Sequence, residues 1–547
     1  MQTDYTGFVD RSEWRWVFSV SVTLVLMTLI PFILVAVLSK SPLDNQFMGA
    51  LHDVEDSAAA MARMQQGIKE GVLLDFLYSP QQQDLIIIHP LYAFLGQLTT
   101  FTQLPVTIMF HVLRIFVSLF MYISIYYLGA KIWMKVRPRR IFFVLTSLSS
   151  GFGWIIALLF SRNETPILVD LTIPQIFPLY ASAANIHYPL AIACVALICA
   201  IIIPVLRPGQ LIRPSVQNGG IIVFFASLLL AFVYPDALLP LGLAYTLNVG
   251  INWWLQKRIN RYEWYWGLWI LVPSLPIIMY DVLIMANNPY VASWIRQRGD
   301  ANPSILMLVL GLGLTFIIAL PGLSRAVRRF EPDGDRLMLL WLLAMIITFY
   351  LPLQLNQYLL LGLMLPIAYF ATRAIEDFWF QSIRRVHRSK VYLIIFPFLI
   401  LSQLVWLFLP VYPAIAGWQG INSTILQNEY GDALRWLRQQ ESETTVVVLA
   451  SPDVSLWIPA RTGNHVVYGH PDETFNADQA LTDVIRWYQQ EDASVTQCQS
   501  LIDQYHVHYV MYGIREQGIG AGACTDNLTP IATFESITIY MTTATDD

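Results

Sequence analysis

Long apolar runs recur along the first three quarters of the chain and predict membrane-spanning helices. Each run has about 18 or more mostly apolar residues, enough to cross a hydrocarbon layer roughly 30 Å thick. The first run is too long for the core of a cleaved signal peptide, so we expect an uncleaved first transmembrane helix. The pattern predicts eleven spans, near residues 16–38, 105–129, 141–160, 187–206, 219–233, 237–255, 264–285, 303–323, 337–353, 357–372 and 391–412.

The distribution of basic residues favours eleven spans over ten. The runs at 219–233 and 237–255 are short, and a single kinked helix would also explain them. With eleven spans, 21 of the 33 Lys and Arg residues lie on one side of the membrane, whereas merging the pair scatters them over both sides. Since basic residues concentrate on the cytoplasmic side, the sequence predicts a multi-pass plasma-membrane protein with its N-terminus inside and its tail outside.

The predicted organisation is a polytopic α-helical membrane domain over residues 1–415, followed by an extracytoplasmic α/β domain over 420–547. Residues 39–104 form a long first outer loop within the membrane domain. In the tail, short β-rich runs and amphipathic helices alternate, which is typical of a small, mostly parallel sheet. These segments are the helices 432–440 and 478–490 and the strand runs 444–451, 465–469 and 506–513.

Composition supports this interpretation and removes some classes of function. The chain is 56% hydrophobic and 13% charged, with a mean hydropathy of +0.52, whereas soluble domains carry about a quarter charged residues. The net charge is −5 and there is no basic tract, so a nucleic-acid partner is excluded. No Cys and His residues have zinc-site spacing. Cys498 and Cys524 lie in the outer tail, where a disulfide is permitted but not required.

An acidic cluster, HDVED at residues 52–56, begins the first outer loop. The AAAMARMQQG stretch that follows is a good helix former, so Asp53 or Asp56 can act as a helix cap with acidic first-turn neighbours. Capping needs one acid, however, and three crowd here. Closely spaced carboxylates are also the arrangement of a general base or of a site for a divalent cation, Mg or Mn, with Asp53, Glu55 and Asp56 as ligands. Both interpretations are open on local physics.

Other polar residues lie on the predicted outer side and are candidates for substrate binding. Arg114 is the only basic residue inside an apolar span, where a functional role, snorkelling or an internal carboxylate partner each explains it. Each of the rest, taken alone, is also explained as a cap, a turn residue or a solvated charge. They are His187, Tyr188, Tyr234, Asp236, Gln354, Asn356, Arg296, Arg298 and His89, the last within the interfacial segment 85–101.

The order of motifs resembles the GT-C superfamily of membrane glycosyltransferases, which includes protein O-mannosyltransferases, oligosaccharyltransferases and aminoarabinose transferases. The closest resemblance is to large, uncharacterised bacterial GT-C-like proteins. DVE (53–55) and ED (55–56) fit the superfamily's acidic pair in the first outer loop. The further matching motifs are SSGFGW (149–154), NIHYPLA (185–191), VYPDALL (233–239), YLPLQLNQYLLLGLMLPIA (350–368), VVYGHPDET (466–474) and YVMYGIRE (509–516).

The resemblance implies transfer of a sugar from a polyprenyl-phosphate or polyprenyl-diphosphate donor to an acceptor at the outer face. Asp56 would be the general base, with Asp53 and Glu55 holding a metal or sugar hydroxyls, and a cation such as Arg114 would stabilise the leaving phosphate. The sequence departs from the family at Asn356, where an Arg is expected nearby. The alternative is a catalytically silent GT-C-fold protein, a structural or accessory subunit of an envelope complex. A transporter is disfavoured because the chain has no internal repeat.

Overall fold

The computed structural model divides the chain into two compact units. We call Met1–Leu29, Leu113–Ile284 and Gly299–Leu409 the membrane unit. We call Ile30–Val112, Met285–Arg298 and Pro410–Asp547 the loop–tail unit. The structure describes residues 8–40, 45–81, 83–87, 89–159, 168–207, 212–257, 260–297, 303–351, 356–412, 423–440, 445–490 and 495–542.

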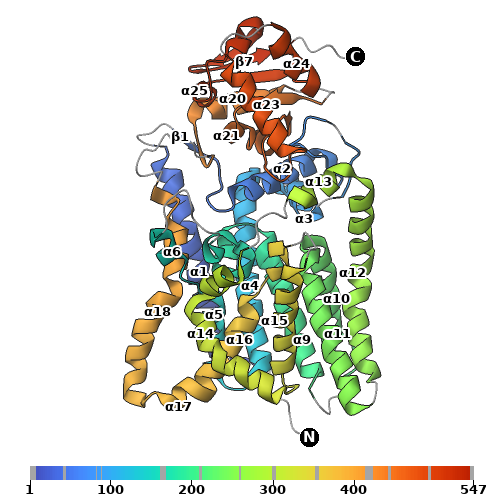
Figure 1. Ribbon diagram of the computed structural model, residues 1–547, viewed down its shortest axis with the longest axis vertical. Helices are drawn as coiled ribbons and strands as arrows, with labels where there is room; N and C mark the ends of the chain where they lie inside the picture. The colour runs from blue at the N-terminus through green and yellow to red at the C-terminus, as the bar shows by residue number, and fades with distance from the viewer. Residues whose placement is uncertain are drawn as a thin grey trace. The chain divides into compact units, whose positions relative to one another are not determined.

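The membrane unit is a bundle of apolar helices. Figure 1 shows α9, α10, α11 and α12 of this unit with roughly aligned axes. The long helices wholly or mostly in the unit are α1 (Arg11–Leu38), α4 (Val106–Ile132), α5 (Val136–Leu148), α9 (His187–Val205), α10 (Gly220–Val233), α11 (Leu238–Gln256), α12 (Arg261–Asn287), α14 (Ile305–Arg329), α15 (Asp335–Tyr350), α16 (Met364–Ala374) and α18 (Arg385–Phe408). Short helices connect them: α6 (Gly153–Leu159), α7 (Val169–Thr172), η1 (Pro174–Ile176), α8 (Pro178–Ala183), η2 (Pro235–Ala237), η3 (Asn356–Leu360), η4 (Ile375–Trp379) and α17 (Phe380–Ser382).

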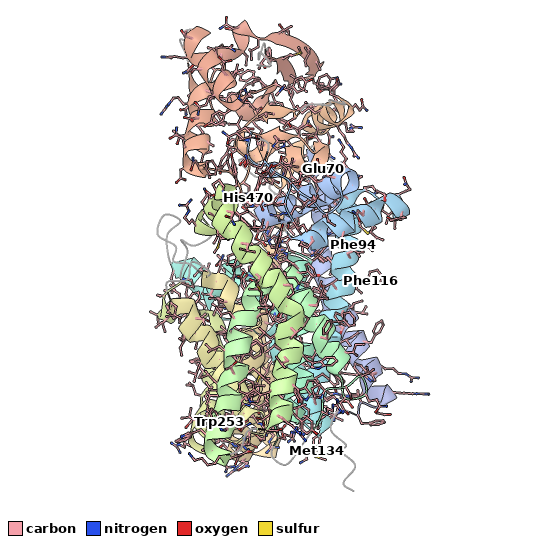
Figure 2. The ribbon with its side chains drawn as sticks, turned by 90° about the vertical axis from the view of Figure 1, so that its right-hand side faces the viewer. Glu70, Phe94, Phe116, Met134, Trp253 and His470 are labelled. Atoms are coloured by element: carbon pink, nitrogen blue, oxygen red, sulfur yellow. A yellow bond between two sulfur atoms is a disulfide. The ribbon has the colours of Figure 1, made fainter. Side chains whose placement is uncertain are left out.

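Several of these helices have the length and composition of membrane spans. Within the described residues, six segments are long and apolar enough, namely Arg11–Leu38, Val106–Ile132, His187–Val205, Arg261–Asn287, Ile305–Arg329 and Gln357–Ser382. Phe116 on α4 and Trp253 on α11 are 64% and 52% exposed, and Figure 2 labels both on the outside of the bundle. Large exposed apolar side chains of this kind suit a lipid surface rather than water. The chain is therefore a polytopic helical membrane protein, while the number of eleven spans stays a prediction.

The short pair of predicted spans forms two separate helices, α10 and α11. The break falls at the YPD sequence, where Tyr234 leaves the helical region with φ −159° and ψ 68°. Pro235 then begins the short helix η2, because proline suits the first turn of a helix but not its interior. Two helices at this position are what the distribution of basic residues requires.

A buried carboxylate explains the SSGFGW motif in the membrane unit. Asp170 of α7 is fully buried, and its Oδ2 accepts hydrogen bonds from the backbone N–H groups of Gly151 and Gly153, both at 3.1 Å. The Ser402 hydroxyl of α18 donates to the same oxygen at 2.5 Å. A buried carboxylate needs such donors to offset its lost hydration. Gly313, with φ 56°, breaks α14 where the helix packs against Gly151.

The loop–tail unit joins the first loop to the C-terminal domain through a two-stranded antiparallel sheet. Strand β1 (Asn45–Phe47) pairs with β2 (Ile425–Gln427), and Gln46 lies opposite Leu426. The other first-loop elements are α2 (Val54–Glu70) and α3 (Pro90–Thr102), which pack on each other. The same unit contains α13 (Pro289–Gln297).

The C-terminal domain has a five-stranded mixed sheet in the order β4-β3-β5-β7-β6. Strands β4 (His465–Val466), β3 (Val447–Leu449) and β5 (Tyr509–Tyr512) are parallel, as the alternating pattern predicts. The antiparallel hairpin β6 (Thr529–Phe534) and β7 (Ile537–Met541) is an addition that the sequence analysis missed. The helices of the C-terminal domain are α20 (Asn428–Gln439), α21 (Pro452–Ser455), α22 (Ile458–Thr462), α23 (Ala477–Gln489), α24 (Val495–Tyr505), α25 (Ile514–Gln517) and η5 (Ala523–Asn527).

A disulfide joins Cys498 of α24 to Cys524 of η5, which answers the pairing question that the sequence left open. Both cysteines are buried in the core beside Trp487 and Tyr488. The other two cysteines, Cys194 and Cys199, are free and buried in α9. Such bonds persist in oxidising compartments, and the outside location of the tail stays a prediction.

Replacing Gly153 with Ala should destabilise the membrane unit. A Cβ at this position would overlap the Asp170 carboxylate, so the Gly153→Ala side chain must displace a buried charge from its donors. We expect a loss of about 1–3 kcal/mol, the usual cost of overpacking, read as a lower melting temperature of the detergent-solubilised protein. The matched control is Gly242→Ala in α11, where a Cβ meets nothing within 4 Å. Equal melting temperatures for the two variants would contradict this account.

Candidate functional site

The acidic cluster lies at the start of α2, in the loop–tail unit, but it is not a simple helix cap. Asp53 is the N-cap residue, in the left-handed region with φ 53°, and its side chain makes no cap hydrogen bond. Its carbonyl instead accepts the Ser57 N–H at 2.9 Å. Non-glycine residues with positive φ are uncommon and concentrate at functional sites. The capping interpretation of this acid is therefore not supported.

The chain just before α2 is held by aromatic packing. The His52 side chain is buried, and its ring lies edge-on to Phe32 at 5.8 Å between centroids. Phe32 also contacts the His111 ring at 5.1 Å, and Nε2 of His111 lies 2.9 Å from the Gly49 carbonyl oxygen. These contacts fix the backbone that sets the first turn of α2.

The three acids of the cluster have different surroundings. Glu55 is exposed and Asp53 is half-buried. Asp56, whose side chain is 36% exposed, faces the C-terminal domain, where its Oδ1 lies 3.7 Å from Nε2 of the buried His470. This is an ion-pair distance, longer than a hydrogen bond.

The turn that carries His470 fixes which ring nitrogen faces Asp56. The His470 Nδ1 accepts the backbone N–H groups of Asp472 at 3.0 Å and Glu473 at 3.2 Å. Nδ1 therefore carries no proton in the neutral ring, and the hydrogen is on Nε2. Burial opposes protonation, but the carboxylates of Asp56, Glu473 and Asp472 outweigh it and raise the pKa of His470. In either state, an Nε2–H points toward Asp56.

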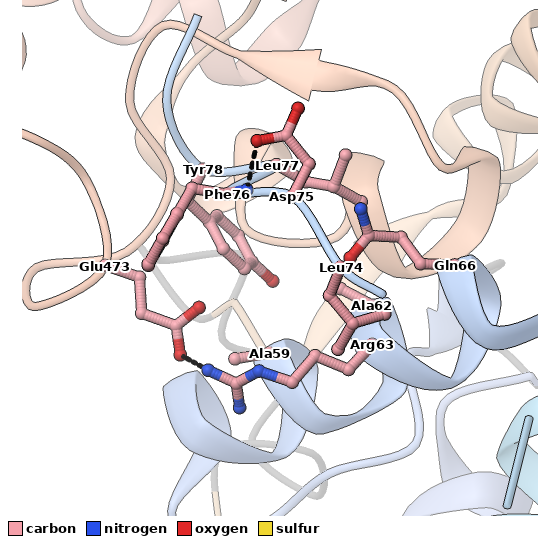
Figure 3. A pocket seen from close by; sticks show the side chains of 10 residues that line it. All are labelled: Ala59, Ala62, Arg63, Gln66, Leu74, Asp75, Phe76, Leu77, Tyr78 and Glu473. Atoms are coloured by element: carbon pink, nitrogen blue, oxygen red, sulfur yellow. Dashed lines mark hydrogen bonds and ion pairs between the residues drawn. The ribbon is translucent and has the colours of Figure 1, made fainter. Parts of the chain in front are cut away.

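Two further pairs of polar side chains link the first loop to the same domain. Arg63 of α2 forms an ion pair with Glu473. Asp75 lies 3.5 Å from Nε2 of His465, and both side chains are less than 10% exposed. Figure 3 shows Arg63, Glu473 and Asp75 around a small pocket. Its free volume of about 20 Å³ holds roughly one water molecule, so this pocket is too small for a sugar.

A divalent-cation site at Asp53, Glu55 and Asp56 is not supported by the geometry. Among the described residues, the acids whose ligand atoms all come within 4.8 Å of one another are Glu331, Asp333 and Asp335. Two acids of this group also pair with a cation, because Arg373 lies 3.0 Å from Asp333 and 3.3 Å from Asp335. No cofactor is therefore established, and an acidic group able to bind a metal lies elsewhere than the sequence analysis predicted.

In the membrane unit, Arg114 has an internal partner. Its side chain is 1% exposed and donates from Nη1 to the backbone carbonyls of Ser182, at 3.2 Å, and Ala183. These carbonyls end the short helix α8, where a positive charge is favourable. Backbone carbonyls thus hold the buried charge, rather than the internal carboxylate that the sequence analysis offered as an alternative.

Several other predicted residues form an aromatic cluster in the membrane unit. His187 contacts Tyr188 at 4.0 Å and stacks on Tyr234 at 6.1 Å between ring centroids. Tyr358 joins this cluster at 6.3 Å from Tyr234, and the sequence analysis did not single it out. Asp236 lies in η2, two residues after Tyr234. It is close enough to Asp281 of α12 for the two charges to interact.

The remaining candidates divide between described and undescribed positions. His89, with φ 44°, begins α3, and its ring lies 5.4 Å from that of Trp294 on α13. Arg296 is exposed on α13, and its Nε donates to the Ala292 carbonyl at 3.2 Å. Arg298 and Gln354 lie outside the described residues, and Asn356 is described only by its backbone in η3. The structure thus groups Asp53, Glu55, Asp56, His89 and Arg296 in the loop–tail unit.

The sequence analysis missed His470 as a functional candidate. The VVYGHPDET motif contributes to the family resemblance, but nothing in the local sequence links it to the first loop. The available signal was the Gly-His-Pro-Asp order, which is typical of a tight turn and places a histidine at its start. A histidine in a turn becomes informative only when its partner is known.

Comparison with solved structures identifies the fold. No protein-family model matches the sequence, and no curated protein matches it. The archaeal oligosaccharyltransferase AglB from Archaeoglobus fulgidus, in complex with an inhibitory peptide and a dolichol-phosphate, matches 98% of this chain and 75% of its own, with 12% identity and a TM-score of 0.50. ArnT from Cupriavidus metallidurans bound to undecaprenyl phosphate matches 94% and 97%, with 14% identity and a TM-score of 0.50. Arabinofuranosyltransferase AftD from Mycobacteria matches 98% and 40%, with 15% identity and a TM-score of 0.51.

The chain has the GT-C fold. This confirms the resemblance inferred from the motif order, together with the polytopic helical architecture and the small C-terminal sheet. At 12–15% identity, the comparison establishes the fold alone. The roles of individual residues in this chain are proposals.

Asp75 provides a pH-dependent test of the contact between the first loop and the C-terminal domain. Burial raises the pKa of Asp75, although His465 and the N–H groups of Phe76 and Gln83 act in the opposite direction. His465 Nδ1 donates to the Ser79 carbonyl at 2.7 Å, so the Nε2 of the neutral ring is an acceptor facing an acidic oxygen. An Asn side chain at position 75 would donate an N–H to His465 Nε2, and its amide oxygen would still accept from the backbone N–H groups.

We therefore expect Asp75→Asn to melt at or above the wild-type temperature near pH 7. Above its ordinary pKa of 3.8, the unfolded Asp75 loses a proton that the folded one still holds, so this group's contribution to stability falls as pH rises. Because the Asn side chain does not titrate, the advantage of the variant should grow between about pH 4 and pH 7. If Asp75→Asn melted well below wild type at about pH 7, the predicted direction of the stability change would be wrong.

Proposed function

We propose that this GT-C protein is a glycosyltransferase that moves a sugar from a polyprenyl-phosphate or polyprenyl-diphosphate donor to an acceptor at the outer face of the membrane. The fold supports the class of enzyme, and two of the similar structures hold a polyprenyl phosphate. The observation that carries the proposal is Asp56, a partly exposed carboxylate at the start of the first-loop helix that faces a fixed N–H group.

Asp56 would serve as the general base. A carboxylate that faces a fixed N–H group and has a partly exposed side chain can accept a proton. In the reaction, the acceptor hydroxyl gives its proton to Asp56 while its oxygen attacks the anomeric carbon of the donor. The bond from that carbon to the phosphate oxygen breaks, and the phosphate leaves with the bonding electrons. Asp53 and Glu55 would hold sugar hydroxyls, and no metal is required by this scheme.

The roles suggested for the membrane unit also belong to the proposal. The stacked pair His187 and Tyr234, with Tyr188, offers flat aromatic faces and hydroxyl groups of the kind that bind sugars and isoprenoid chains. Arg114 would act on the leaving phosphate only if it exchanged a carbonyl partner for the lipid. Because the isoprenoid chain of the sugar donor is apolar, we expect the donor to reside in the membrane lipid.

Asp56→Asn should abolish sugar transfer while leaving folding and membrane insertion intact. Loss of a general base lowers the rate by about 10²–10⁴-fold, measured as transfer of a labelled sugar from polyprenyl-phosphate donors to envelope acceptors. The matched control is Glu70→Gln at the other end of α2, where the residue is exposed and has no proposed role, and we expect a much smaller effect. An Asn variant as active as wild type would exclude Asp56 as the base.

If no donor supports transfer by the wild-type protein, the alternative of a silent accessory subunit gains support. That alternative predicts a stable, stoichiometric protein partner that co-purifies from mildly solubilised membranes.

The membrane orientation is testable separately from the chemistry. A periplasm-dependent reporter such as alkaline phosphatase, fused after residue 547, should be active in a bacterial host, because the basic loops predict an outside tail. The same reporter fused within the basic segment 131–140 should be inactive. Activity in the reverse pattern would show that the orientation is wrong.

A further inference from the structure

We infer that His470, in the C-terminal domain, is a positioning residue for Asp56 and orients its carboxylate for proton transfer. The inference rests on the proposed function. It assigns the C-terminal domain a role in catalysis, through a residue that itself touches neither sugar nor lipid.

The first support is the geometry of the turn that holds the imidazole. Nδ1 accepts from two backbone N–H groups, and the Thr474 hydroxyl oxygen accepts the His470 N–H at 3.2 Å. The turn closes with a hydrogen bond from the Thr474 N–H to the His470 carbonyl at 3.0 Å. The ring is therefore fixed at both its backbone and its side chain, and rotation would cost the two bonds at Nδ1.

The second support is the packing around the ring. The His470 side chain is 2% exposed and lies 5.5 Å from the ring of Tyr78 between centroids. The preceding Gly469 allows this approach, because a Cβ there would come within 2.9 Å of Tyr78 and the Ser455 carbonyl. A ring held this firmly presents its N–H in one direction, as a preorganised donor should.

The third support is that α2, the helix that carries Asp56, is itself anchored to the His470 turn. Arg63, two helical turns after Asp56 on α2, pairs with Glu473 of the same turn. The two elements are thereby fixed to each other at two points. Among the described residues, the titratable groups that face His470 are Asp56 of α2, Asp472 and Glu473 of its own turn, and Tyr78. The 3.7 Å separation is within the range that shortens to a hydrogen bond when substrate binds.

Two substitutions separate the positioning role from the structure of the turn. The amide oxygen of Asn occupies the place of Nδ1, so His470→Asn keeps the acceptor for the two N–H groups but has no group that reaches Asp56. The amide nitrogen of Gln reaches the place of Nε2, so His470→Gln keeps the donor to Asp56 but leaves the turn N–H groups without their acceptor. The two variants should therefore fail in opposite respects.

We expect His470→Asn to melt near the wild-type temperature and to lose about 10–100-fold in kcat, the usual cost of losing an orienting partner, with KM little changed. His470→Gln should melt lower but retain more of kcat. Removing the donor also raises the pKa of the base, so the acidic limb of the kcat/KM profile should move to higher pH in the Asn variant. The control is His465→Asn, which alters the histidine facing Asp75 and should leave kcat and this limb unchanged.

A His470→Asn variant with wild-type kcat and an unmoved acidic limb would overturn the inference, provided that Asp56→Asn is inactive in the same assay. The inference would also be overturned if the Asn and Gln variants lost kcat only to the extent that each lost stability. That result would show that His470 has a purely structural role. If wild type transfers no sugar, or if Asp56→Asn is fully active, the proposed function itself fails, and this outcome is distinguishable from the other two.

Discussion

A charged side chain that leaves water must find a partner, and the contact between α2 and the C-terminal domain is built from such partners. Arg63 and Glu473, 410 positions apart in the chain, form a largely buried ion pair. Removing one member of a buried pair costs several kcal/mol, roughly 3–5, because the other is left uncompensated. This constraint, together with the β1–β2 ladder, makes the first loop and the tail one compact unit. The position of Asp56 depends on it.

The same constraint explains most of the buried charge in the membrane unit. Asp170 is held by two glycine N–H groups and the Ser402 hydroxyl, and Arg114 by two carbonyls at the end of α8. Both therefore have structural explanations that the sequence alone did not provide. Asp56 differs from Asp170 in that its carboxylate is more than one-third exposed while its partner is buried. The carboxylate of Asp56 is therefore more accessible to solvent than that of Asp170.

Local patterns predicted the elements well and their long-range contacts poorly. The break between α10 and α11, the parallel strands β3, β4 and β5 and the acidic start of α2 all follow from hydropathy, charge and turn residues within a short window. His470 was missed because its meaning comes from a partner on a distant helix, and no periodicity encodes that contact. The sequence also did not predict that Asp53, Glu55 and Asp56 have different surroundings. The reason is related, since the left-handed backbone at Asp53 lies beside the packing of His52 on Phe32.

The central claim is that the first-loop acid acts on a lipid-linked sugar. It is tested most directly by a high-resolution structure of the full-length protein with a non-hydrolysable polyprenyl-phosphate sugar bound in a lipid nanodisc. Our account predicts the sugar-phosphate head group beside α2, with an Asp56 oxygen within hydrogen-bonding distance of the acceptor position and Nε2 of His470 on the other oxygen. A head group bound away from α2, or Asp56 enclosed in protein contacts with the lipid present, would contradict it.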